Sequence, residues 1–411
     1  MTNTFQLSAA VHCRPLSAWP RLSVELLGTQ TRFVQGARWR HRVIESGDAD
    51  GEPLILIHGV GGHAESFARN MHGLARQGFH VYSIDALYHG FSDKQPYDDD
   101  KRYVHQVEAV VDLIDALGHD TVHIEGESMG ATIAFHFGLS HPERTRKVVL
   151  NTGFGHVKLN KSDFKPVKGD MGELARLSRE VVVDPNAAAM RKRLEWVVAE
   201  PESMTDEMVE IRLALYSDPP LINDSMRKVF RLDKDWSWDL PYSEEDLVDY
   251  RPETLVLWTE HNPGDGPDYG EYIASILPNG KFYCIDGAGG HWPQWERPEE
   301  HDAVLTEFLL GRAYQLQAPD PGHHARPAGR SPVIVTGGRP TQLRSTRHRK
   351  SHAGGRASAG LPCCRRRREP QQDAVVLLVA SRDRPRKDER LTCRREQLTP
   401  AQSPSAGGAG G

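Results

Sequence analysis

The residue most clearly suited to chemistry is Ser128, in the run Gly126-Glu127-Ser128-Met129-Gly130. This run fits the pattern Gly-x-Ser-x-Gly, in which the glycines allow a sharp turn that presents a serine hydroxyl at the edge of a sheet. A strand pattern over 121–125 precedes it and a helical pattern over 129–140 follows. The sequence therefore predicts a nucleophilic serine, with the backbone N–H of Met129 donating to an oxyanion.

A second oxyanion donor is expected in the loop His58-Gly59-Val60-Gly61-Gly62, which follows an apolar strand pattern. Its glycines allow the backbone to approach a ligand closely. The N–H of Val60 is the first candidate donor and that of Gly61 the second. A flexible turn between strand and helix would have the same composition, so the loop indicates an oxyanion site only in combination with Ser128.

A serine nucleophile needs a base, and the base needs an orienting group. The chain contains 20 histidines, so residue type alone does not identify the base. His291 stands out because it follows the last expected strand, and the histidine comes last in chain order when such a turn carries the nucleophile. Three histidines that precede the serine in turns are expected to be structural: His58, His63 and His89.

The orienting acid is expected in the segment 260–268, directly after the strand pattern over 254–259. Asp265 is the most plausible carboxylate there, and Asp268 and Glu260 are weaker candidates. An aspartate in this segment could also serve only as a turn residue, because glycine and proline surround it.

These residues need a framework, and the chain alternates short apolar runs with helical patterns. This alternation predicts a mostly parallel, doubly wound α/β sheet. The expected strands are 53–58, 80–85, 121–125, 147–151, 254–259 and 281–286, and the expected helices among the first four are 64–77, 102–117 and 129–140.

Between about residues 154 and 250 the alternation stops, and helical patterns cover 171–182, 186–198 and 205–215. A helical insertion of this kind most simply forms a lid over the carboxyl edge of the sheet, where open α/β folds place their sites. A helical subdomain remote from any site is the alternative. We therefore divide the chain into a core (30–153 and 251–311), a lid (154–250) and a tail (312–411).

Charge separates the tail from the rest of the chain. Residues 1–311 hold 31 Lys and Arg against 49 Asp and Glu, a net of −18, whereas residues 312–411 hold 20 against 7, a net of +13. The low-complexity, arginine-rich composition predicts a disordered tail that plays no part in catalysis. The alternative is an arm that binds nucleic acid through counterion release.

Composition also indicates the cellular compartment of the protein. No apolar run approaches the roughly 18 residues needed to span a bilayer, and the first 20 residues lack the pattern of a secretory signal. Cys13 and Cys284 are the only cysteines before the tail, so we expect no disulfide framework. We expect a cytoplasmic protein without membrane association.

Taken together, residues 30–311 resemble the α/β-hydrolase superfamily, and within it the meta-cleavage product hydrolases, which split carbon–carbon bonds in ring-fission products of aromatic degradation. The loop at His58 and the turn at Ser128 carry the superfamily resemblance. The segment from Gly290 to Glu296, Gly-His-Trp-Pro-Gln-Trp-Glu, is similar to the sequence around the histidine of that subgroup.

The resemblance also implies substrate-binding residues. The segment 205–212 resembles a lid helix of the family whose arginine binds the substrate carboxylate, which points to Arg212; a solvated helix charge is the alternative. A guanidinium suits this role because its planar fork pairs with a carboxylate at two points. We also expect Gly61 and Trp292 to contact the substrate.

The chain departs from the family at three places. Asn262 stands where the family has an aspartate, so either Asp265 reaches His291 through a shifted loop or the triad is incomplete. Glu127 replaces an asparagine that often precedes the serine. The run Tyr88-His89-Gly90 replaces Gly-His-Gly.

The resemblance implies a serine hydrolase that needs no cofactor or metal and acts on a small molecule, either a carboxylate-bearing dienoate or an ester. C–C bond hydrolysis is the first expectation. A carboxylesterase or lactonase of the same fold is the alternative, and a non-catalytic ligand-binding relative with an incomplete triad is another. Assembly into a homo-oligomer is possible for each.

Overall fold

The computed structural model describes residues 3–11, 13–14, 21–164, 167, 169, 171–232, 242–287 and 289–314. These residues all lie within one compact unit. The expected basic tail lies outside the described residues from position 315 onward.

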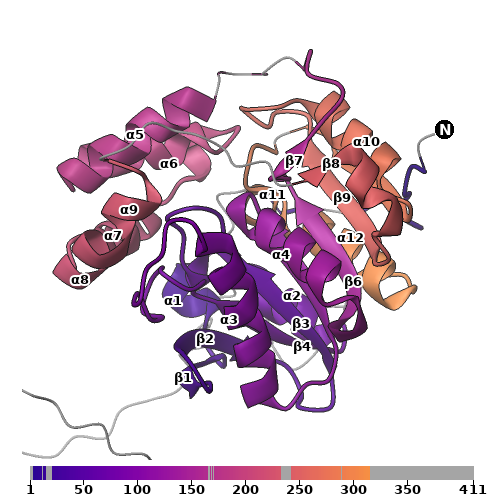
Figure 1. Cartoon of the computed structure of the whole chain (residues 1–411), viewed down its shortest axis with the longest axis horizontal. Coiled ribbons are helices and arrows are strands. Elements are labelled where there is room, and N and C mark those ends of the chain that lie inside the picture. Colours follow the sequence, from indigo (N-terminus) through magenta and orange to yellow (C-terminus); the bar gives the residue numbers. More distant parts are fainter. Residues whose placement is uncertain are drawn as a thin grey trace, which may run out of the picture. The chain divides into compact units, whose positions relative to one another are not determined.

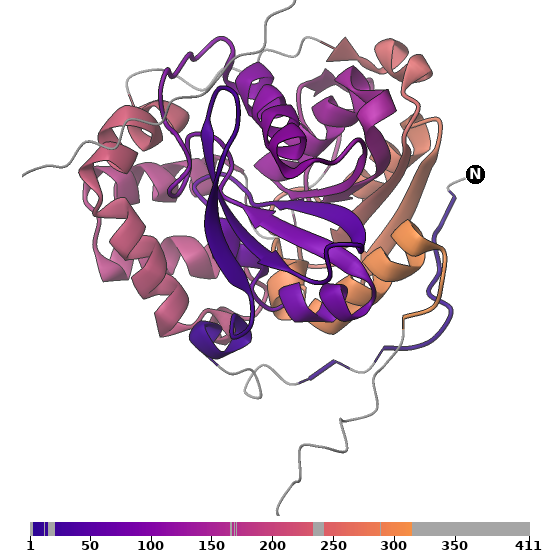
Figure 2. The same ribbon diagram turned by 90° about the horizontal axis from the view of Figure 1, so that it is seen from below.

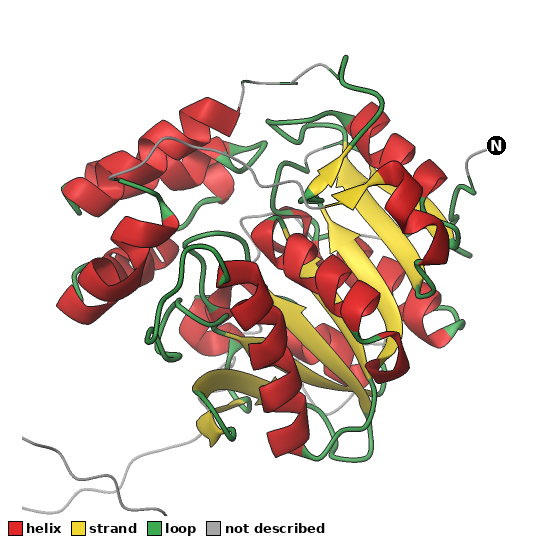
Figure 3. Ribbon diagram, in the orientation of Figure 1, coloured by secondary structure: helices red, strands yellow, loops and turns green. Residues whose placement is uncertain are grey.

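An eight-stranded sheet forms the centre of the described fold, in the order β1-β2-β4-β3-β5-β6-β9-β10 (Figures 1 and 3). The edge strand β1 pairs antiparallel with β2, β2 pairs antiparallel with β4, and the pairs from β4 to β10 are all parallel. The strands are β1 (Gln30–Gln35), β2 (Arg40–Ser46), β3 (Glu52–Ile57), β4 (Phe79–Ile84), β5 (Val122–Glu127), β6 (Thr145–Asn151), β9 (Glu253–Thr259) and β10 (Gly280–Ile285). The predicted α/β-hydrolase sheet is therefore confirmed, with the β1–β2 hairpin added.

Helices cover both faces of the sheet (Figure 2). On one face α3, α4 and α10 pack against Ile55 and Ile57, and on the other α2 and α12 pack against Leu54 and Leu56. Burial on both faces explains why these strands are continuously apolar rather than alternating. The helices are α1 (Leu22–Glu25), α2 (Met71–Arg76), α3 (Arg102–Leu117), α4 (Met129–Ser140), α10 (Pro267–Ile276), α11 (Pro293–Glu296) and α12 (Pro298–Leu310), with short turns η2 (Ala64–Phe67), η3 (Pro142–Arg144) and η6 (Glu244–Asp249).

One expected helix, 64–77, is divided in the structure. A 3₁₀ turn, η2, comes first, and α2 begins only at Met71. The N–H of Ala64 donates to Asp85 Oδ1 at 2.8 Å, which holds the first turn against the end of β4. This anchor separates the turn from the helix that follows.

Between β6 and β9 the chain forms a separate group of helices, which we call the helical layer (171–232; Figure 1). Two of its helices, the segments 187–196 and 206–216, begin at a capping side chain: Asn186 accepts the Ala189 N–H and Thr205 accepts the Met208 N–H. The layer has its own apolar core, which includes Leu177, Met190 and Met208 and extends to Trp292. Its elements are α5 (Met171–Val183), α6 (Ala187–Trp196), η4 (Pro201–Ser203), α7 (Asp206–Tyr216), α8 (Pro219–Leu221), η5 (Ile222–Met226) and α9 (Arg227–Val229), with the short strands β7 (Val157–Lys158) and β8 (Tyr242–Ser243) before and after it.

Candidate active site

The turn between β5 and α4 places Ser128 in a strained backbone conformation, with φ 55° and ψ −113°. The flanking glycines are required by packing. A Cβ on Gly126 would lie 1.9 Å from the Gly130 carbonyl oxygen, and one on Gly130 would lie 2.2 Å from that of Ile57. Such strain persists only where the surroundings enforce it, and it is typical of functional sites. The geometry is that of the serine-bearing turn expected from the sequence.

The glycine loop, residues 58–62, lies beside this turn. Gly61 has φ +71°, which favours glycine, and the Gly62 N–H closes the loop on the Gly59 carbonyl at 2.9 Å. Val60 lines the same cavity as Ser128 and Met129. The structure thus brings the two expected oxyanion donors to one place.

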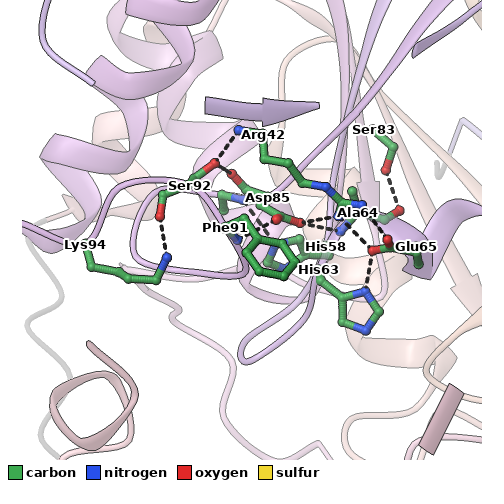
Figure 4. A network of polar contacts seen from close by, with 11 residues as sticks. Arg42, His58, His63, Ala64, Glu65, Ser83, Asp85, Phe91, Ser92 and Lys94 are labelled. Atoms are coloured by element: carbon green, nitrogen blue, oxygen red, sulfur yellow. Dashed lines mark hydrogen bonds and ion pairs between the residues drawn. The ribbon is translucent and has the colours of Figure 1, made fainter. Parts of the chain in front are cut away.

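A buried polar network supports the glycine loop from the sheet side (Figure 4). Asp85, at the end of β4, accepts the N–H groups of Ala64 at 2.8 Å and Phe91 at 2.7 Å. Arg42 pairs with both Asp85 and Glu65. Because the side chains of Asp85 and Arg42 are buried, their contacts hold the start of η2 and thereby the end of the glycine loop.

His291 is fixed by three contacts. Its N–H donates to the Val197 carbonyl at 2.7 Å, its carbonyl accepts the Thr152 hydroxyl at 2.8 Å, and its Nδ1 lies 2.7 Å from Asn262 Oδ1. The imidazole lines the same cavity as Ser128. Burial, followed by the nearby charge of Arg193, lowers the pKa of His291 to about 3. The ring is therefore neutral at pH 7.

The partner of His291 is Asn262, which corrects the expectation that Asp265 orients the histidine. The Asn262 Nδ2 donates to the Asp265 carbonyl at 2.7 Å, so Oδ1 is the atom left to accept from His291 Nδ1–H. Asp265 takes part through its backbone carbonyl, which also accepts the Trp258 indole N–H at 2.9 Å. Burial and the charge of Asp268 raise the pKa of the Asp265 carboxyl, which lines the cavity.

Glu127 is a site residue that the sequence analysis recorded only as a departure. Its side chain is 1% exposed, its Oε2 accepts the Gly59 N–H at 2.6 Å, and its Oε1 lies 3.3 Å from His291 Nε2. Burial raises its pKa to about 8, although Gly59 and two arginines oppose the shift. The sequence shows that a carboxyl directly precedes the serine, but it does not show that this side chain points toward His291.

Two arginines of the helical layer contact the glycine loop. Arg212 Nη1 donates to the Gly61 carbonyl at 2.6 Å, and Arg193 Nη2 donates to that of Val60 at 3.1 Å. Arg212, expected to bind a substrate carboxylate, is not among the residues that line the cavity. Burial and the neighbouring Arg193 lower its pKa to about 10.

The cavity has a volume of about 730 Å³ and lies between the sheet edge and α5. Ser128, His291 and Val60 line it, whereas Gly61 and Trp292 do not. Trp292 lies beside a smaller hollow with Glu127 and Arg193. Lining residues that the sequence analysis missed include Arg102, Tyr103, Arg179 and the segment 152–157 after β6.

Among the described residues, no group of three or more His, Cys, Asp or Glu side chains is arranged to hold a metal ion. In the same residues, helices of the length and apolar character needed to cross a bilayer are absent.

A serine on a strained turn between a parallel strand and a helix, with a histidine after the last strand, defines the class of α/β hydrolases. The family model described as alpha/beta hydrolase fold matches residues 52–298. The chain belongs to this family.

Among relatives, the chain is 27% identical over 263 residues to a 2-hydroxy-6-oxo-6-phenylhexa-2,4-dienoate hydrolase of Burkholderia cepacia, covering 63% of this chain and 88% of that enzyme. It is 28% identical over 262 residues to a 2-hydroxy-6-oxononadienedioate/2-hydroxy-6-oxononatrienedioate hydrolase of Paraburkholderia phymatum, covering 63% and 87%. These relatives agree with the resemblance found in the sequence and support a hydrolase.

A solved structure with a similar fold is the 2-hydroxy-6-oxo-6-phenylhexa-2,4-dienoate hydrolase of Rhodococcus sp. strain RHA1, with a TM-score of 0.60, 24% identity and coverage of 69% of this chain and 99% of that one. A carboxylesterase of Bacillus subtilis is also similar, with a TM-score of 0.55, 18% identity and coverage of 71% and 96%. At these identities the likeness concerns the fold.

Proposed function

We propose that this protein is a serine hydrolase that cleaves a carbon–carbon bond in a ring-fission product of aromatic degradation. The observation that carries the proposal is that Ser128, His291, Val60 and Met129 all line one cavity, which α5 of the helical layer also borders. The named activities of the relatives supply the substrate class.

In this mechanism His291 is the base. Its Nδ1–H is held by Asn262, so the lone pair of Nε2 is available to accept a proton. That proton comes from Ser128, or from a water molecule, as the oxygen attacks the substrate ketone. The N–H groups of Val60 and Met129 then stabilise the negative oxygen of the tetrahedral intermediate. Before this step, His291 assists ketonisation of the dienol.

Cationic side chains in the cavity lining could bind a substrate carboxylate. Arg102, Arg176 and Arg179 all contribute to this surface. Arg102 lies at the start of α3, where its guanidinium donates to the Val229 carbonyl at 3.2 Å, lies over the ring of Tyr103 and interacts with the side chain of Tyr97. It therefore has positive charge available for an anionic group at the end of the cavity formed by α3.

One observation favours the carboxylesterase alternative. Arg212 is bound to the Gly61 carbonyl, and its guanidinium does not reach the cavity lining. A substrate without a carboxylate at that position, such as a neutral ester, would need no such cation. Ester hydrolysis would use the same serine, histidine and N–H groups.

Parallel assays of a ring-fission dienoate and an activated ester test the proposal. We expect higher kcat/KM with the dienoate, and loss of turnover in both Ser128→Ala and His291→Ala. Turnover of the ester alone would favour the carboxylesterase. Wild-type rates in either variant would refute the assigned site, and wild-type protein that turns over neither compound and fails to react with a fluorophosphonate would indicate a ligand-binding protein.

A further inference from the structure

The carboxyl of Glu127 lies on the side of His291 that faces the nucleophile. Its Oε1 is 3.3 Å from Nε2, and both residues border the small hollow next to Ser128. Within the described residues, Nε2 has no hydrogen-bond partner. The contact is therefore one of proximity alone, and the lone pair of Nε2 remains available to the nucleophile.

A base that accepts a proton becomes a cation, and a buried imidazolium is costly without a negative partner. Asn262 accepts the Nδ1–H but carries no charge, and the Asp265 carbonyl rather than its carboxylate faces that amide. Arg193 adds positive charge to the surroundings of the ring. Glu127 is the acidic group paired with His291 in the described structure.

We propose that Glu127 is a positioning residue that acts through His291, supplying the negative charge that stabilises the imidazolium and that Asn262 cannot provide. This inference rests on the proposed function, because it takes His291 as the base. The nucleophile proton passes to Nε2, and Glu127 remains a carboxylate throughout the step. In its protonated form Glu127 cannot serve this purpose.

The ionisation of Glu127 follows from the groups that face it. The Gly59 N–H, Arg193 from α6 and Arg212 from α7 favour the carboxylate, whereas burial and Glu125 from the same strand oppose it. Burial is the largest influence, and the pKa of Glu127 rises to about 8. His291 adds no charge at neutral pH, since its own pKa is lowered to about 3.

Activity should therefore increase with pH in a range where the histidine does not titrate. A carboxyl with a pKa of about 8 is ionised in roughly 1% of molecules at pH 6 and in about half at pH 8. We expect the reactivity of Ser128 to rise about 50-fold over this interval and to level off near pH 9.

The experiment is to measure the rate at which a fluorophosphonate labels Ser128 between pH 5.5 and 9.5, since this reaction needs no natural substrate. Glu127→Gln keeps the shape and the acceptor for the Gly59 N–H but cannot ionise, so its rate should stay near the wild-type value at pH 6. Asp268→Asn, an exposed acid of the neighbouring helix, is the matched control and should retain the wild-type rise.

A second variant keeps the test decisive if Glu127→Gln does not fold. Asn262→Asp places a carboxylate on Nδ1, so labelling should already be fast at pH 6 and change little with pH. A flat wild-type profile, a rise that persists in folded Glu127→Gln, or a rise that persists in Asn262→Asp would each overturn the inference. Wild-type protein that is not labelled at any pH would overturn the serine-hydrolase proposal itself, and the role of Glu127 with it.

Discussion

Asn262→Asp is the substitution that most directly tests how His291 works. The Asn262 Oδ1 already lies 2.7 Å from Nδ1, so an aspartate would place a carboxylate oxygen at the same point without moving the ring. The amide already fixes the tautomer that leaves the Nε2 lone pair available. The substitution therefore isolates the effect of negative charge on the imidazolium.

The magnitude follows from the geometry. Opposite unit charges centred about 4 Å apart attract by ~4 kcal/mol at an effective dielectric constant of about 20. The variant also loses the Asn262 Nδ2 hydrogen bond to the Asp265 carbonyl at 2.7 Å, which costs about 1 kcal/mol. That cost is the same before and after the proton transfer, so it lowers the free energy of unfolding and leaves the barrier unchanged. An attraction of ~4 kcal/mol sets an upper bound of roughly a 10³-fold increase in kcat.

The assay is steady-state hydrolysis of an activated ester at pH 7, together with the melting temperature. We expect higher kcat for Asn262→Asp and a melting temperature a few degrees lower, because the unpaired carboxylate is buried beside a carbonyl oxygen. Asp268→Asn serves as the control for a change of charge in the same segment. A folded Asn262→Asp protein with unchanged or reduced kcat would refute the reasoning that the histidine lacks a negative partner.

Three other predictions concern the site and the core. Ser128→Ala should lower kcat by about 10³-fold or more without a loss of melting temperature, and a smaller effect on turnover would argue against a serine nucleophile. Gly153→Ala should lower the free energy of unfolding by about 2 kcal/mol and impair labelling of Ser128, because its Cβ would lie 2.5 Å from the Ser128 carbonyl oxygen. His301 is buried, which alone would lower its pKa, but Glu125 and Asp302 raise the pKa to about 9. The stabilisation from its proton is thus complete below about pH 6.5 and lost as the pH rises through 9. Denaturant unfolding between pH 6 and 9.5 should show this loss in wild-type protein and a smaller one in His301→Gln, and equal slopes would contradict it.

The sequence predicts the parallel strands and two helices of the core well, because their patterns are determined by local burial. The strands β3, β4 and β5 are buried along almost their whole length, and α4 is buried on all sides from Met129 to Gly138. The β1–β2 hairpin was not predicted. Only Val34 is fully buried in β1, so the strand has no clear apolar signal and is formed by pairing with β2.

The positions of Ser128 and His291 were predictable because each follows a strand of recognisable type. The side chains that contact them were not predictable, because the direction of each side chain depends on the folded backbone. Asn262 and Asp265 lie three residues apart. The turn brings the side-chain amide of Asn262 to His291 and the backbone carbonyl of Asp265 to that amide. Arg212 likewise lies on the expected helix, but its side chain extends to the Gly61 carbonyl instead of the cavity.

The contacts of Arg193 and Arg212 with the Val60 and Gly61 carbonyls have a consequence for protein engineering. Charge-assisted hydrogen bonds of this kind are among the stronger ones, and here they join two helices of the helical layer to the loop that holds the proposed oxyanion donors. A chimera that takes the helices of one hydrolase and the sheet of another would break these pairs and leave the loop carbonyls without donors. In such chimeras the helices and the glycine loop should therefore be transferred together, from the same parent protein.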